Sequence, residues 1–224
     1  GFVAGGMACG IKASGADDLA LILCPDSANV AAMFTRNLVR AAPIVLSQQR
    51  IERTKGRMRA LIINSGGANA ATGEEGMRRA THVMDALASR LGCPREEALM
   101  NSTGVIGEQL PDDLIVKALP ALIAACNADG LSRAALAMHT TDTRLKMARQ
   151  AVTHGGRTCS VTGIAKGAGM IHPDMATTIG VIMTDAKVDA PALHRMLRAA
   201  VERSFHRISV DGDTSTNDAV FLLA

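Results

Sequence analysis

Two adjacent threonines at the entrance of an apolar run offer the clearest catalytic chemistry in this sequence. Residues 163–185 read GIAKGAGMIHPDMATTIGVIMTD, so Thr177 and Thr178 separate a glycine-rich segment from Ile179–Met183. An uninterrupted apolar run of that length indicates a buried strand. If the chain is cut between Ala176 and Thr177, the new α-amine of Thr177 lies beside its own hydroxyl and can act as its base. The alternative is an ordinary glycine loop that enters a core strand, and these residues alone leave both interpretations open.

Three other segments place small polar residues where a ligand could bind. Asn64–Gly73 follows the apolar run Met58–Ile63, and ligand loops of α/β proteins lie at the carboxyl ends of strands. Asn101–Gly107 contains Ser-Thr-Gly, in which the glycine allows a close backbone approach and its N–H can donate to an oxyanion. Thr140–Thr143 offers several short donors and acceptors. Ordinary turns and helix caps are the alternatives for these segments.

The glycine-rich segment resembles the self-cleavage site of a known enzyme family. Lys166–Pro173, followed by Met-Ala-Thr at residues 175–177, is similar to a segment of the ornithine acetyltransferase family, also called glutamate N-acetyltransferase, of arginine biosynthesis. Members of that family cut themselves before this threonine into an α and a β chain. Further segments resemble the family in the same order, at residues 64–70, 101–107, 140–143 and 207–218. Gly67 departs from a family asparagine, and Thr178 stands where methionine is frequent.

The resemblance covers nearly the whole chain and implies its fold and organisation. The implied fold is α/β, a layered sheet–helix fold of the ornithine acetyltransferase/aminopeptidase type with an N-terminal-nucleophile threonine. Residues 1–176 would form the α chain, and residues 177–224 would begin the β chain at the nucleophile. The sequence starts at Gly1 and stops at Ala224 inside an apparent strand, so we expect a fragment truncated at both ends, with the remainder of the β chain missing.

The resemblance also implies a reaction and a set of site residues. In a ping-pong transfer, Thr177 attacks the acetyl group of N-acetylornithine, its own amine takes the proton, and ornithine leaves. Glutamate then takes the acetyl group from the acetyl-threonine intermediate. Thr103 and Gly104 carry over as the oxyanion hole, and Thr140, Lys166 and Thr177 carry over as substrate-binding residues. We assign the nucleophile to Thr177 because it directly follows the Met-Ala pair.

The implied cycle needs no cofactor and no metal, although some family members also use acetyl-CoA as the acetyl donor. The implied assembly contains two α and two β chains, and the implied location is the cytoplasm. Family members draw further substrate contacts from a later part of their sequence. Two other functions stay open, namely an N-terminal-nucleophile aminopeptidase of related fold and a non-catalytic α/β binding domain.

The composition argues against several other classes of protein. A net charge of +3 over 224 residues, with no Trp and no Tyr, gives neither a basic surface nor stacking platforms for nucleic acid. The sequence contains no run of 18 apolar residues, so it predicts no membrane-spanning helix. The five scattered cysteines and six dispersed histidines lack the spacing of a disulfide framework or a zinc site, which favours a reducing cytoplasm. No Gly-Lys-Ser/Thr follows the glycines, which disfavours a nucleotide site.

The remaining pattern predicts the elements that must position the candidate residues. We expect strands at residues 18–24, 30–35, 42–46 and 58–63, with Pro25 ending the first, and a hairpin at residues 146–153 and 158–164. A capping box of Thr72 and Glu75 predicts a helix that ends at Gly92. Further helices are expected at residues 111–119, 120–128 and 132–138, and after Asp189. The loop at residues 207–218 is expected to shape the site.

Overall fold

The computed structural model describes residues 1–172 and 178–224, so the predicted cleavage position between Ala176 and Thr177 lies outside the described residues. The strands are β1 (Val3–Met7), β2 (Leu19–Phe34), β3 (Arg57–Gly67), β4 (Ala98–Val105), β5 (Lys146–His154), β6 (Arg157–Lys166), β7 (Ile179–Thr184) and β8 (Ala219–Leu223). The helices are α1 (Ala42–Arg53), α2 (Gly73–Leu91), α3 (Asp112–Ala125), α4 (Leu131–Ala137) and α5 (Ala190–Glu202). None of the helices that the structure describes combines the length and apolarity needed to cross a bilayer.

The strands form one sheet organised around the long strand β2. Their order is β4-β3-β2-β8-β7-β6-β5, with β1 paired to β2. The first part of β2 pairs with β1 and β3, and its last part pairs with β8, with a register shift between Leu23 and Ala28. The pairs β3–β4 and β7–β8 are parallel. Strand β2 therefore joins a β1–β4 half of the sheet to a β5–β8 half.

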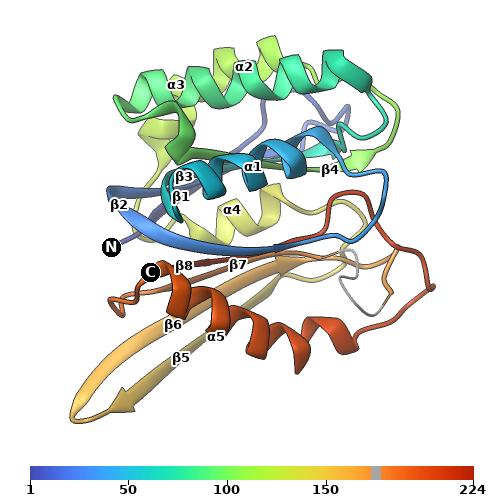
Figure 1. The fold of residues 1–224 in the computed structure, drawn as a ribbon. Coiled ribbons are helices and arrows are strands. Elements are labelled where there is room, and N and C mark those ends of the chain that lie inside the picture. The colour runs from blue at the N-terminus through green and yellow to red at the C-terminus, as the bar shows by residue number, and fades with distance from the viewer. Residues whose placement is uncertain (173–177) are drawn as a thin grey trace.

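The two halves of the sheet share a central core and carry helices on their other faces. Ile22 and Ile63 of the first half cluster with Val181 and Phe221 of the second half and with residues of α4. Alternate residues of β2 and β3 pack against α2 and α3 instead, and alternate residues of β8 pack against α5. Figure 1 shows the resulting layers, with α2 and α3 on one outside and α5 on the other. The predicted layered α/β fold is confirmed.

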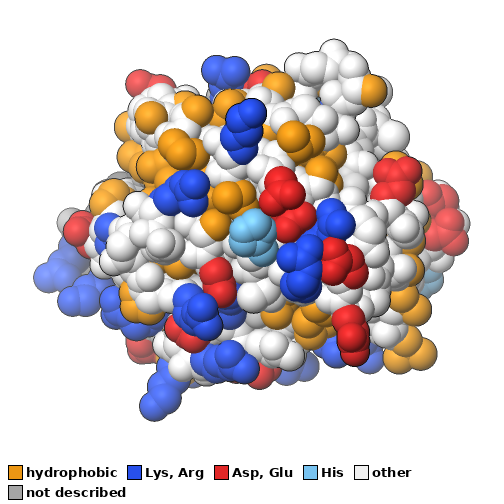
Figure 2. Space-filling model, turned by 90° about the horizontal axis from the view of Figure 1, so that it is seen from above, with side chains coloured by type: hydrophobic (Ala, Val, Ile, Leu, Met, Phe, Trp, Pro, Cys, Tyr) orange, Lys and Arg blue, Asp and Glu red, His pale blue; other side chains and the backbone are white. Residues whose placement is uncertain are grey.

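The outer face of α2 and α3 is a solvated surface of mixed charge. Side chains of both signs are interspersed there in Figure 2. Glu75 pairs with Arg78 and Arg79 along α2, and Arg79 also reaches Asp112 at the start of α3. An exposed ion pair such as that of Glu75 with Arg78 contributes little to stability. The apolar faces of these helices, which point to the sheet, therefore provide most of their anchoring.

Two proline-containing segments differ from the prediction. Residues 42–46 form the start of α1 and not a strand, because Pro43 lies in the first turn, where a missing N–H costs nothing. The buried residues of α1 recur at the spacing of a helix, and a five-residue window shows only an apolar run. Pro25 also does not end β2, since it lies inside the irregular stretch between Leu23 and Ala28, where the ladder tolerates proline.

Two helix boundaries also differ from the prediction. Residues 112–125 form the single helix α3, with Pro120 on its exposed face, where the backbone group left unpaired by proline can meet water. Thr72 does not cap α2 with its side chain, because its hydroxyl donates to Asn69 Oδ1 at 2.8 Å. The predicted left-handed stop at Gly92, the cap of α5 by Asp189, helix α4 and the β5–β6 hairpin are confirmed.

Candidate active site

A buried lysine brings three distant segments of the chain together. Lys166 ends β6 and is only 4% exposed. Its Nζ donates to Thr103 Oγ1 at 3.0 Å and to Thr140 Oγ1 at 2.9 Å. Thr103 lies in β4 and Thr140 follows α4, at sequence separations of 63 and 26 residues from Lys166. The fold therefore gathers three predicted site residues from three separate elements.

The parallel pairing of β3 and β4 sets the position of Thr103. In the register of this pair Ser65 lies opposite Thr103, and Gly66 lies opposite Gly104. Gly104 has a φ of +135°, and a Cβ at that position would lie 2.3 Å from the carbonyl carbon of Gly66. Only glycine fits both the backbone conformation and this close approach. The glycine that follows Thr103 is thus required by the local geometry.

The gathered residues line a pocket of about 570 Å³. A volume of this size is typical of sites for small molecules. The pocket is lined by Lys12, Gly66, Ala68, Thr103, Gly104, Val105, Ile106, Thr140, Thr141, Lys166, Gly169, Met170, Ser215, Thr216 and Asn217. Residues from both halves of the sheet therefore contribute to one cavity.

Burial and neighbouring carboxyl groups control the charge of Lys166. Burial lowers the pKa of Lys166, and the neighbouring carboxyl groups of Asp142 and Asp218 act in the opposite direction. Burial alone would raise the pKa of Asp142, but hydrogen bonds from Lys146 Nζ at 2.5 Å and from the Gly167 N–H at 2.8 Å hold that pKa below its usual value. Asp142 thus stays ionised near Lys166 and offsets part of the cost of burying an ammonium group.

The glycine-rich segment after β6 is fixed by a carboxylate from the C-terminal loop. Asp211 accepts hydrogen bonds from the N–H groups of Met170, at 2.5 Å, and Ile171, at 2.7 Å. The bond from Met170 and the bond from Ile171 both lower the pKa of Asp211. The loop at residues 207–218 therefore shapes this part of the site, as the sequence predicts.

Comparisons with known proteins decide the family. The model of the ArgJ family matches residues 3–224. The chain belongs to the ArgJ family. A relative from Symbiobacterium thermophilum, named arginine biosynthesis bifunctional protein ArgJ, is 47% identical over 226 residues, which cover 100% of this chain and 56% of that protein. The chain thus spans about half the length of the curated ArgJ relatives it matches.

Solved structures of ArgJ relatives have the same fold. ArgJ from Bacillus halodurans aligns with a TM-score of 0.74 and 39% identity, over 79% of this chain and 91% of that chain. Ornithine acetyltransferase from Mycobacterium tuberculosis, solved in complex with ornithine, aligns with a TM-score of 0.68 and 38% identity, over 78% of this chain and 92% of that chain. The L-aminopeptidase D-Ala-esterase/amidase from Ochrobactrum anthropi, a variant of the Ntn hydrolase fold, reaches 0.59 at 12% identity, which is a likeness of fold alone.

The pocket of this ArgJ-family chain unites the predicted site residues that the structure describes. These are Thr103, Gly104, Thr140 and Lys166. The predicted cleavage and nucleophile residues, Ala176 and Thr177, lie outside the described residues. Thr178 is buried just before β7, and its N–H donates to Asp218 Oδ1 at 3.1 Å.

Sequence reasoning missed Lys12, which lines the pocket from the N-terminal loop. The carboxylate of Asp18 accepts hydrogen bonds from four backbone N–H groups of residues 9–12 and so folds this loop. Lys12 Nζ then donates to the carbonyl oxygens of Asp17 and His139, both at 2.8 Å. The available signal was Asp18 at the edge of an apolar run, next to a segment rich in glycine.

Asn217 was also missed, and it links the C-terminal loop to both parallel strands of the site. Its Nδ2 donates to the carbonyl oxygens of Ala68, at 2.7 Å, and Ser102, at 2.8 Å. Its own carbonyl oxygen accepts from Asn101 Nδ2 at 3.1 Å. The available signal was a row of small polar residues directly before a strictly apolar strand.

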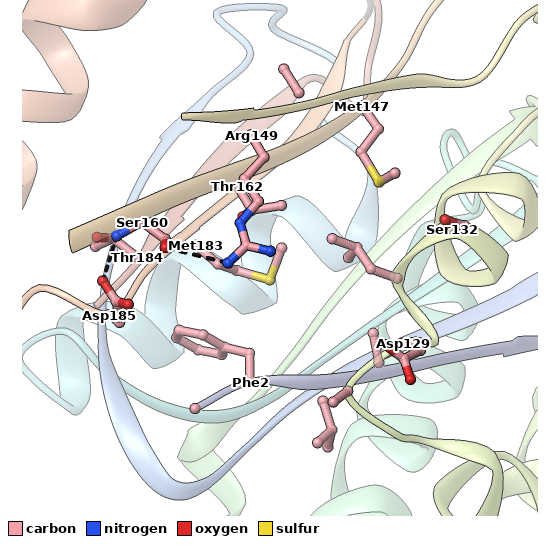
Figure 3. Close-up of a pocket in the computed structure, with 16 residues that line it drawn as sticks. Phe2, Asp129, Ser132, Met147, Arg149, Ser160, Thr162, Met183, Thr184 and Asp185 are labelled. Carbon is pink, nitrogen blue, oxygen red and sulfur yellow. Dashed lines mark hydrogen bonds between the residues drawn. The ribbon is translucent and has the colours of Figure 1, made fainter. Parts of the chain in front are cut away.

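A second pocket, of about 460 Å³, lies at the opposite end of β6 and β7. Figure 3 shows Arg149, Ser160 and Asp185 gathered on one side of it. Arg149 donates to Ser160 Oγ at 3.4 Å, and the Ser160 N–H donates to Asp185 Oδ1 at 2.7 Å. Arg149, Asp129 and Asp185, the charged side chains in its lining, are all exposed. Its charged side chains are therefore solvated, whereas Lys166 is buried.

Proposed function

We propose that this chain carries the catalytic part of an ArgJ acetyltransferase, which moves the acetyl group of N-acetylornithine to glutamate in arginine biosynthesis. The observation that carries this proposal is that the buried Lys166 donates to Thr103 and Thr140 in a pocket of small-molecule size. Membership of the ArgJ family supports the reaction class. The relative from Mycobacterium tuberculosis, an ornithine acetyltransferase solved with ornithine, supports the substrate class.

The hydrogen bonds of Lys166 indicate what its partners can donate. Thr103 Oγ1 accepts from Nζ, so the Thr103 O–H can still donate, and the neighbouring positive charge makes it a stronger donor. Together with the Gly104 N–H it forms a pair of donors suited to a developing oxyanion. An ammonium group has three donors, of which two bond the threonines, and the third can bind a substrate carboxylate.

In the proposed cycle Thr177 is the nucleophile. Its Oγ attacks the acetyl carbonyl of N-acetylornithine while its own α-amine accepts the hydroxyl proton. Thr103 and Gly104 stabilise the tetrahedral oxyanion. The C–N bond then breaks, ornithine leaves with the proton from the α-amine, and the acetyl group stays on Thr177. The amine of glutamate attacks this ester and loses a proton to the same α-amine, and the Thr177 hydroxyl is restored.

The free α-amine requires a prior cut between Ala176 and Thr177. We propose that Thr177 Oγ attacks the carbonyl carbon of Ala176, so that the acyl group moves from nitrogen to oxygen, and water then hydrolyses the ester. The products are an α chain that ends at Ala176 and a β chain that begins at Thr177. Two copies of each chain would form the assembly, in the cytoplasm. The cycle requires no cofactor or metal, and acetyl-CoA is an alternative acetyl donor.

The test compares the two neighbouring threonines. It uses the chain together with any sequence that its gene places after residue 224, and it measures intact mass and acetyl transfer from N-acetylornithine to glutamate. Thr177→Ala is expected to leave an uncut chain without transfer, whereas Thr178→Ala is expected to be cut before residue 177 and to retain transfer. Cutting in Thr177→Ala would contradict the nucleophile assignment. Release of amino acids from peptides without acetyl transfer would favour the aminopeptidase alternative.

A further inference from the structure

A buried carboxyl group contacts the peptide that follows the proposed nucleophile. Asp218 directly precedes β8 and is 1% exposed, and its Oδ1 accepts from the Thr178 N–H at 3.1 Å. This N–H belongs to the peptide group that joins Thr177 to Thr178. The next residue along, Ala219, donates its N–H to the Thr178 carbonyl at 3.2 Å. Thr178 is therefore held on both sides by consecutive residues of one segment.

The backbone of Asp218 is also held in place by a hydrogen bond. The Asp218 carbonyl accepts from the Thr35 N–H at 2.9 Å, which ties this residue to the end of β2. Ser215 lies close enough to the carboxyl group to lower its pKa. A side chain with an anchored backbone and a buried acceptor can set the position of a neighbouring peptide closely, because few rotamers are open to it.

The second carboxyl oxygen distinguishes Asp218 from a simple structural acceptor. Asp218 Oδ2 is buried and has no hydrogen-bond partner among the residues that the structure describes. An unpaired buried oxygen costs free energy, so a group that serves folding alone is expected to have both oxygens paired. Lys166 is the charged group that faces this carboxyl. Burial raises the pKa of Asp218 to about 8, so at neutral pH the group is mostly uncharged and can act as an acceptor without repelling an oxyanion.

We infer that Asp218 is a positioning residue of the proposed acetyl transfer, which acts by holding through its Oδ1 the backbone N–H of Thr178, the residue after the proposed nucleophile. The inference rests on the proposed function and adds a residue to it. Asp218 acts through this peptide and not on the substrate. The acceptor oxygen and its place are therefore what matter, and the acidity of the group is secondary.

The experiment uses three substitutions at one position, in the chain with any sequence that follows residue 224 in its gene. Asp218→Asn keeps an acceptor oxygen in place, Asp218→Ala removes it, and Asp218→Glu keeps the carboxyl group but displaces it by one methylene. The matched control is Asp185→Ala, since Asp185 Oδ1 also accepts a backbone N–H, from Ser160 at 2.7 Å, but at the other end of the strands. The readouts are kcat and KM for acetyl transfer, melting temperature, and hydrogen exchange of the Thr178 amide.

Positioning predicts a specific pattern among these variants. Asp218→Asn should retain kcat within about fivefold, and Asp218→Ala and Asp218→Glu should each lose at least about tenfold, with KM within about threefold for all. Asp185→Ala should leave kcat unchanged. Equal losses in Asp218→Asn and Asp218→Ala would overturn the inference, because they would assign the role to the acid proton. Full activity of Asp218→Ala would also overturn it.

Two further readouts separate this inference from folding and from the proposed function. If Asp218→Ala does not fold, the comparison of the other two variants decides. Asp218→Asn should have a higher kcat than Asp218→Glu, and the reverse order overturns the inference. If the unsubstituted protein transfers no acetyl group, the proposed function fails. The Thr178 amide then decides whether Asp218 holds this peptide at all. It should exchange slowly in the parent and in Asp218→Asn and at least about tenfold faster in Asp218→Glu, and equal exchange in all three overturns the inference.

Discussion

The two ends of the β6–β7 pair carry similar residues in different physical states. At one end Lys166 is buried and donates to two threonine hydroxyls from other elements at 3.0 and 2.9 Å. At the other end, shown in Figure 3, Arg149 is exposed and donates to the hydroxyl of Ser160 in the adjacent strand at 3.4 Å. Both ends have a cation, hydroxyl groups and a carboxylate. Only at the Lys166 end is the cation itself removed from water.

Burial changes what the same groups can do. A charge interacts with its neighbours several times more strongly in a protein interior than at a surface. A buried, hydrogen-bonded lysine also cannot reorient freely, so its partners keep fixed positions for a substrate. Exposed Arg149 can exchange its partner for water at little cost. The two pockets differ little in volume, about 570 against 460 Å³, so preorganisation and not size marks the first as the site.

The largest expected effect comes from removing each cation in turn. Lys166→Met is expected to lower kcat/KM for acetyl transfer by a factor on the order of 10²–10³, because it removes the donor to both threonines and to a substrate carboxylate. Stability should be unchanged or higher, since the cost of burying the charge disappears and Asp142 keeps its bond from Lys146. Arg149→Met is the matched control and should leave kcat/KM within about twofold. Steady-state kinetics and urea unfolding of both variants check this, and equal losses would remove the distinction between the two ends.

The hydroxyl partners of the two cations give the next test. Thr103→Val keeps the shape of the side chain but removes the hydroxyl, and kcat should fall by a factor on the order of 10² if it donates to an oxyanion. Thr103→Ser should recover most of that loss. Ser160→Ala removes the corresponding hydroxyl at the Arg149 end, and kcat should not change. A rise in KM with kcat unchanged in Thr103→Val would argue against the oxyanion role.

The sequence predicted the members of the Lys166 site better than their contacts. Thr103, Gly104, Thr140 and Lys166 were named from motifs, and the glycine conformation at residue 104 could be expected from its type. The contact of Lys166 with two threonines could not be predicted from the sequence. It depends on how the sheet order brings together β4, β6 and the segment after α4. Periodicity reports which face of an element is apolar and does not report which elements become neighbours.

The errors in the fold share a related physical cause. Residues 42–46 and Pro120 were each interpreted from their immediate neighbours, whereas a proline is tolerated according to its position within a whole helix. Asp218 was passed over because a carboxyl group in a polar stretch is normally exposed, and its burial at 1% arises only from packing between β2 and β7. Local rules predict elements reliably where one segment decides the outcome, and they fail where a second segment does.

A third comparison concerns the stability of alanine variants at two glycines, one where β3 and β4 approach closely and one in the hairpin turn. Gly104→Ala places a Cβ 2.3 Å from the Gly66 carbonyl carbon, and Gly156→Ala, in the hairpin turn at the other end, meets no atom within 4 Å. Both glycines have positive φ, which costs about 1–3 kcal/mol for alanine. Because of the clash, the unfolding free energy of Gly104→Ala should be lower than that of Gly156→Ala by roughly 1–3 kcal/mol. Urea unfolding measures the difference, and equal stabilities would mean that β4 can move away from β3 without cost.

The last comparison concerns the response of stability to pH at the buried carboxyl group of Asp218. Burial raises the pKa of Asp218 from 3.8 to about 8. Between these values the folded protein keeps a proton that the unfolded chain has released, so the stability that this group contributes is fully present below 3.8 and is lost as pH rises through about 8. Asp218→Asn should therefore flatten the decline of unfolding free energy over that pH range, relative to the parent. Urea unfolding at a series of pH values measures both slopes. If Asp218→Asn gives the same slope as the parent, the carboxyl group beside Thr178 does not stay buried and protonated, and the contrast between the ends of the strands rests on Lys166 alone.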